Sequence, residues 1–147
     1  MAPASLTAVA RHFLFVRETQ GPNRGAWVSM LQRFCGGHDG DSWCADFVSF
    51  VLDIAYRGHA PLSKTGSTLH MLNEADANHY RVSTPAIDDL YFFLRLDGTP
   101  HHVGIVTNIA PLTGIAGNTS DDGLSTNGVG VFEHEIPRTR TVFVRLA

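Results

Sequence analysis

The sequence predicts an α+β fold in which N-terminal helices pack on a C-terminal antiparallel β-sheet. Up to Pro85, apolar residues recur every three or four positions, the period of a helix with one buried face. Beyond Pro85 they fall in short runs rich in β-branched and aromatic residues. Helices followed by strands, without alternation, favour α+β over a doubly wound sheet. The 147 residues suit a single domain, spanning 1–147, whose core needs no disulfides.

Four helices are expected in the first part of the chain. They span residues 5–17, 26–34, 43–56 and 67–77. The third has the clearest pattern, because apolar or small residues at 44, 47, 48, 51, 52 and 55 form one stripe. Stretches rich in glycine and other turn residues, at 20–25, 35–40 and 57–61, interrupt the helical pattern.

Five strands are expected in the second part. They span residues 90–94, 103–106, 114–116, 130–132 and 141–144. Turn residues such as Asp97, Gly98 and Pro100 separate these runs, which indicates an antiparallel sheet with short connections.

Composition narrows the range of functions. The chain has 11 basic and 14 acidic residues, a net charge of −3, and no cluster of Lys and Arg, which disfavours nucleic-acid binding through a basic surface. No apolar run approaches the roughly 18 residues of a membrane span. Residues 1–10 lack the basic and apolar regions of a secretory signal, so we expect neither a span nor a signal.

Cys44 lies where the third helix should begin. Asp41 and Ser42 are candidate N-caps, since their side-chain oxygens can accept hydrogen bonds from the first backbone N–H groups. A thiol in the first turn feels the positive end of the helix dipole, which predicts a lowered pKa and a nucleophile. The alternative interpretation is a small buried apolar residue. A Cys35–Cys44 disulfide is a further alternative on spacing alone, and it would consume the nucleophile.

A nucleophilic thiol needs a base, and two of the eight histidines are placed to supply one. His101 and His102 open the strand at 103–106, on opposite faces, while the other histidines fit solvated surface positions. Gly104 leaves space beside His102 for a close approach, but alternation alone does not settle which face meets the Cys44 helix. One strand later, Asn118 offers an amide that can orient an imidazole, although a turn residue is the alternative there.

These residues together resemble the CHAP domains, which are cysteine- and histidine-dependent amidohydrolases and peptidases of the NlpC-type, papain-like superfamily. The resemblance rests on residues 23–25, 43–49, 89–93, 102–106 and 116–123, in that order along the chain. It implies a papain-like fold with Cys44 as nucleophile, His102 as general base and Asn118 as the polar residue that completes the constellation. One departure is Ala116, where family members commonly carry a Glu that orients the imidazole.

The resemblance implies a peptidoglycan hydrolase that cuts an amide bond through a thioacyl-enzyme, as an N-acetylmuramoyl-L-alanine amidase or an endopeptidase. We expect Trp43, Tyr91 and His101 to contact the substrate, with packing as the alternative for the two aromatic rings. A catalytically impaired wall-binding or structural protein is the second interpretation, on account of Ala116. A cytoplasmic thiol protease is a third, disfavoured because Trp43 precedes the cysteine.

No metal or cofactor is required by this chemistry. There is no His-Glu-x-x-His motif or Cys-x-x-Cys pair, and the loop with His38, Asp39 and Asp41 lacks the spacing of a calcium site. We expect a monomer, made in the cytoplasm without a signal peptide, that acts at the bacterial cell wall. It would arrive there as a phage lysin or as a delivered effector, with export machinery and an immunity protein as its partners.

Overall fold

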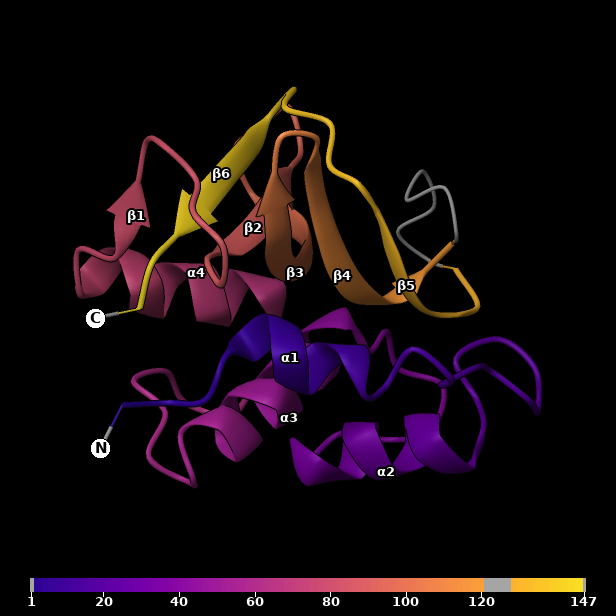
Figure 1. Cartoon of the computed structure of the whole chain (residues 1–147). Helices are drawn as coiled ribbons and strands as arrows, with labels where there is room; N and C mark the ends of the chain where they lie inside the picture. The colour runs from indigo at the N-terminus through magenta and orange to yellow at the C-terminus, as the bar shows by residue number, and fades with distance from the viewer. Residues whose placement is uncertain (1, 121–127, 147) are drawn as a thin grey trace.

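The computed structural model describes residues 2–120 and 128–146, which form a layer of helices against a β-sheet (Figure 1). The helices are α1 (Leu6–Arg11), α2 (Ala26–Phe34), α3 (Cys44–Ala55) and α4 (Thr68–Ala77). The strands are β1 (Arg81–Val82), β2 (Leu90–Leu94), β3 (Pro100–Ile109), β4 (Leu112–Thr119), β5 (Gly130–Glu135) and β6 (Thr141–Val144). The predicted α+β class, with helices before strands, is confirmed.

The sheet is antiparallel throughout, in the order β1-β6-β2-β3-β4-β5. Five of its six strands were expected from the sequence, although β3 to β5 are longer than the predicted runs. The two-residue strand β1 was missed, because two residues carry no period. β2 and β3 lie at the centre of the sheet, which places the motif around His102 in the interior.

α3 is the central helix of the helical layer. Nine of its twelve residues are buried, because α1 and α2 cover one side of it while β3 and β4 cover the other. Figure 1 shows α1, α2 and α3 gathered below the strands. The side chains of Val103, Ile105 and Ile115 face this helical layer. The opposite face of the sheet carries a second, smaller apolar cluster that includes Tyr91, Phe93 and Ala116.

The first helix is shorter than predicted, ending at Arg11 rather than at residue 17. Beyond it the backbone pairs with β5 instead: the N–H of Val131 donates to Val16 at 3.1 Å, and that of Glu18 donates to Val129 at 2.8 Å. Since these partners lie more than a hundred residues away in the chain, local periodicity could not anticipate them.

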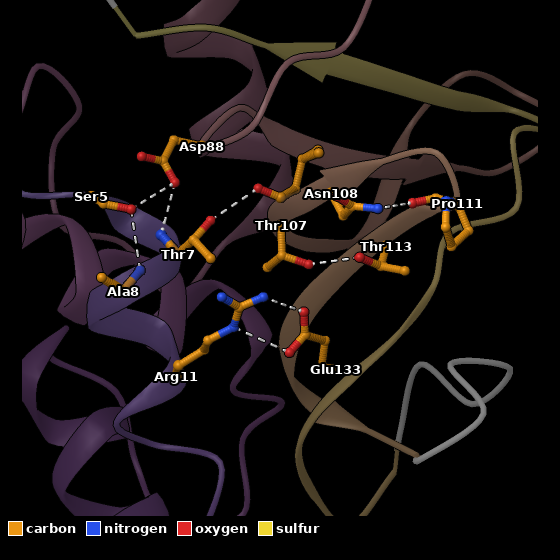
Figure 2. A network of polar contacts seen from close by, with 11 residues as sticks. Ser5, Thr7, Ala8, Arg11, Asp88, Thr107, Asn108, Pro111, Thr113 and Glu133 are labelled. Atoms are coloured by element: carbon orange, nitrogen blue, oxygen red, sulfur yellow. Dashed lines mark hydrogen bonds and ion pairs between the residues drawn. The ribbon is translucent and has the colours of Figure 1, made fainter.

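Polar contacts attach α1 to the sheet (Figure 2). The Asp88 carboxylate accepts hydrogen bonds from the Thr7 backbone N–H at 2.8 Å and from the Ser5 hydroxyl at 3.3 Å. At the other end of the helix, Arg11 forms an ion pair with Glu133 of β5 at 2.9 Å. These contacts fix the position of α1 relative to the sheet. Among the described residues, no helix is both long enough and apolar enough to cross a bilayer.

Candidate active site

Cys44 is the first residue of α3, as the sequence predicts, but the helix is capped differently. Neither Asp41 nor Ser42 is the N-cap: Trp43 takes that position and makes no side-chain cap. The prediction was wrong because the Asp41 carboxylate serves the preceding loop, where it accepts the His38 backbone N–H at 2.8 Å. The first N–H groups of α3 therefore stay available to other acceptors.

The Cys44 sulfur is one such acceptor. Hydrogen bonds from the backbone N–H groups of Val103, Ala45 and Cys44 itself each lower the pKa of the thiol. Burial acts in the opposite direction and is stronger, since the residue is only 5% exposed, and the pKa of Cys44 rises to about 11. The expected lowering of the pKa is therefore wrong for this structure, because desolvation of the thiolate outweighs the helix terminus.

A thiol with this pKa should be alkylated slowly at neutral pH. In a Cys35→Ala background, we expect the rate of Cys44 labelling by iodoacetamide to rise about tenfold per pH unit from about pH 7 to about pH 10, because the thiolate fraction grows tenfold per unit below the pKa. The urea-unfolded chain, with a cysteine pKa of about 8.5, should react faster throughout most of that range. A rate that is already constant below about pH 7 would instead indicate a resting thiolate–imidazolium pair.

Cys44 reaches the sheet where β3 and β4 separate. The Val106 N–H donates to Asp89, beside β2, so by alternation the Val103 N–H points toward β4. The β3–β4 ladder runs only as far as Ile105 opposite Ile115, since β4 carries an irregularity between Ala116 and Thr119. The Val103 N–H is thus available to the thiol, which lies beside the residue that follows His102.

His102 lies on the Tyr91 face of the sheet and is completely buried. Its ring stacks on Phe93, with centroids 5.4 Å apart and planes inclined by 24°. Both ring nitrogens lack a hydrogen-bond partner among the described residues. Burial, followed by repulsion from His134 and His101, lowers the pKa of His102 to about 3, so the imidazole is neutral at pH 7.

Asn118 is the third predicted residue, and it occupies the irregular part of β4. Its backbone is left-handed, with φ of 54°, a conformation that asparagine tolerates better than most residues. Asn118 lies three residues beyond Ile115, where the β3–β4 ladder ends. The amide is fully buried, and neither its oxygen nor its nitrogen has a partner among the described residues. The Cys44 sulfur thus lies beside Val103, the residue that follows His102, and Asn118 lies on the adjoining strand β4.

The three predicted substrate contacts differ in exposure. Trp43 and Tyr91 are fully buried. The Trp43 indole N–H donates to Glu18 at 3.0 Å, and its ring packs on Gly117. Both rings therefore serve packing here, the alternative that the sequence left open. His101 is half-buried, and burial together with Arg95 and Arg140 lowers its pKa.

Two features of the site escaped sequence reasoning. His134 was assigned to the surface, yet it lies buried on β5 and contacts Tyr91. The signal that could have revealed it is the pair Gly104 and Gly114, because the absence of their side chains leaves room for Tyr91 to reach His134. No sequence pattern indicates Glu18, which accepts the hydrogen bond from the Trp43 indole N–H.

The remaining alternatives concern thiols and metals. Cys35 and Cys44 are free thiols, so the alternative disulfide is absent. Within residues 2–120 and 128–146, no three His, Cys, Asp or Glu side chains gather as a metal-binding group. Comparisons with protein-family models, with curated proteins and with solved structures found no match.

Proposed function

We propose that this chain is a papain-like cysteine hydrolase that cleaves amide bonds of peptidoglycan. The observation that carries the proposal is the position of the Cys44 sulfur beside Val103, the neighbour of His102, with Asn118 on the adjoining strand. The polar side-chain atoms of His102 and Asn118 are buried and have no partner among the described residues. Buried polar groups without partners cost stability and are uncommon in proteins, which favours a role for them in chemistry. The likeness of the surrounding residues to CHAP domains supplies the substrate class.

The reaction begins from neutral groups. As the Cys44 sulfur attacks the amide carbonyl, its proton passes to His102, and a C–S bond forms. The oxyanion accepts hydrogen bonds from the backbone N–H groups that open α3, a contribution of about 3–4 kcal/mol for one donor in other enzymes. His102 then gives its proton to the leaving amine as the C–N bond breaks. Water hydrolyses the thioester and restores the thiol.

Asn118 has the supporting part. During the reaction His102 carries a positive charge, which its buried surroundings oppose. The Asn118 side-chain oxygen, on the neighbouring strand, can accept the N–H of the far imidazole nitrogen and stabilise that charge. This interaction is worth more in the transition state than at rest, which is the condition for catalysis. The enzyme would be an amidase or an endopeptidase, acting as a monomer at the bacterial cell wall after delivery or release.

A second function has observations in its favour. Cys44 and His102 are buried, with the pKa of the thiol raised to about 11 and that of the imidazole lowered to about 3. Ala116 offers no carboxylate to offset the lowered pKa of the imidazole. These features suit a wall-binding or structural protein that keeps the fold and has impaired catalysis.

Incubation with purified sacculi of several chemotypes separates the two functions. For the hydrolase we expect soluble fragments, and mass spectrometry of the new termini identifies the bond that is cut. Protein treated with iodoacetamide after unfolding and refolding serves as the blocked control. Sedimentation with the sacculi without release of fragments would favour the wall-binding protein. If the protein neither sediments with the sacculi nor releases fragments from any chemotype, both proposed functions are contradicted.

A further inference from the structure

Tyr91 and His134 form a buried polar pair on the same face of the sheet as His102. The Tyr91 hydroxyl and His134 Nε2 lie 3.3 Å apart, and His134 Nδ1 lies 2.8 Å from the carbonyl oxygen of Glu135. A carbonyl oxygen only accepts, so Nδ1 carries the hydrogen and Nε2 of the neutral ring is the acceptor. The Tyr91 hydroxyl therefore donates to His134.

Two glycines make this long-range contact possible. Tyr91 pairs with Gly104 across β2 and β3, while Gly114 pairs with His134 across β4 and β5. A Cβ atom at either glycine would collide with the Tyr91 ring. The ring thus lies across two strands that carry no side chain beneath it, and its hydroxyl reaches a fourth strand. The contact between Tyr91 and His134 is possible only because residues 104 and 114 are both glycine.

The same ring lies beside His102. The ring centroids of Tyr91 and His102 are 6.3 Å apart. Phe93, two residues after Tyr91 on β2, stacks on the His102 ring. No hydrogen bond from the described residues orients the imidazole, and position 116 supplies a methyl group only. The aromatic rings that surround His102 are thus what holds it. Tyr91 is also close enough to Cys44 for a thiolate to raise the pKa of its hydroxyl.

We propose that Tyr91 and His134 are positioning residues that hold the His102 imidazole for proton transfer with Cys44. This inference rests on the proposed hydrolase function. The hydrogen bond to His134 fixes the Tyr91 ring, and the fixed ring confines the imidazole, which replaces the orienting carboxylate that is absent at Ala116. Neither residue touches the substrate or exchanges the catalytic proton.

His134 has an electrostatic effect as well. It faces His102 from β5, while His101 lies next to His102 on β3, and both oppose its protonation. Tyr91 of β2 and Cys44 of α3 are neutral at pH 7, because burial raises the pKa of each. Removing His134 should therefore make His102 easier to protonate, whereas removing the Tyr91 hydroxyl alone should not.

The test is a double-mutant cycle of Tyr91→Phe and His134→Gln, measured in the full chain. Each single variant should lower kcat for sacculus hydrolysis about tenfold, the worth of one buried hydrogen bond, with KM within about twofold. The double variant should be no slower than either single variant, because both break the same contact. The matched control is Thr107→Val, which removes a buried hydroxyl hydrogen bond of 2.8 Å to Thr113, about 17 Å along β3 from His102.

Nitrogen NMR of His102 separates positioning from general loss of stability. The wild type should show a single His102 tautomer, Tyr91→Phe a mixture of two, and Thr107→Val the wild-type spectrum. In His134→Gln the pKa of His102 should rise. A kcat loss no larger than that of Thr107→Val, additive losses in the cycle, or an unchanged tautomer in Tyr91→Phe would each overturn the proposal.

The design also distinguishes failure of the hydrolase function itself. If the wild type digests no sacculus, the rate of Cys44 alkylation replaces kcat in the same cycle, and the NMR measurement stands unchanged. If the variants do not fold, the wild-type spectrum decides: His134 must be protonated at Nδ1, and the Tyr91 hydroxyl proton must exchange slowly. The opposite His134 tautomer would contradict the pair.

Discussion

Replacing Cys44 with alanine should abolish the release of peptidoglycan fragments, with kcat reduced by a factor on the order of 10³ or more. In the proposed mechanism the Cys44 sulfur is the atom that forms the covalent bond, and an alanine methyl group cannot replace it in this role. Alanine suits both the helix and the buried site, so the fold should survive. The measurement is the initial rate of fragment release by mass spectrometry, with the circular dichroism spectrum as a check of folding.

Cys35→Ala is the control for this prediction, because Cys35 is the other free thiol and forms hydrogen bonds with Asp46 and Ser49. Burial and the nearby Asp46 raise the pKa of Cys35 to about 12. We expect kcat within about twofold of the wild type, as is usual for substitutions away from the reacting groups. Equal losses in the two variants, or full activity in Cys44→Ala, would refute the thiol mechanism.

The second large effect concerns stability. Trp43→Ala should reduce the free energy of unfolding by about 3–5 kcal/mol, the usual cost of deleting a fully buried large aromatic side chain. The ring fills the space between α3 and Gly117 of β4, and its N–H is bonded to Glu18. Urea unfolding followed by circular dichroism measures the loss. Since a domain is stable by only about 5–15 kcal/mol, the variant should be marginally stable at best.

The chain offers a matched control in its other tryptophan. Trp27 is 41% exposed on α2, so Trp27→Ala should cost much less than Trp43→Ala. Trp43→Phe should fall between them, because it keeps most of the apolar volume and loses the hydrogen bond to Glu18. If Trp43→Ala left stability unchanged and weakened only binding to sacculi, the ring would serve the substrate, as the sequence-based interpretation expects.

Local patterns in the sequence predicted most of the fold. The limits of α2, α3 and α4 agree with expectation to within one residue, because each helix has a stripe of apolar residues bounded by turn residues. The end of α1 did not follow from its pattern, since residues 16–18 pair with β5 from the far end of the chain. Periodicity contains no information about a partner so distant, and so the helix was extended too far.

The site was predicted in part, for a similar reason. The order of Cys44, His102 and Asn118 along the chain indicated residues that could meet, and the last two do lie on neighbouring strands, β3 and β4. Whether the Cys44 thiol is exposed to solvent or desolvated depends on which residues pack over it, and that is a property of the folded chain. The dipole argument therefore predicted a lowered pKa, whereas desolvation raises it. For the same reason, because the sequence does not show which side chains pack together, Tyr91 was predicted to contact the substrate and His134 to lie on the surface.

The pairing of residues 16–18 with β5 also bears on how the protein behaves at high concentration. A bare strand at the edge of a sheet can recruit a strand of another molecule and start aggregation. Here the beginning of β5 is occupied by the chain itself, Arg17 donates to the Val131 carbonyl at 3.2 Å, and Glu133 is held by Arg11. The other edge is β1, with two residues only. Both edges of the sheet are thus poor templates for fibril growth.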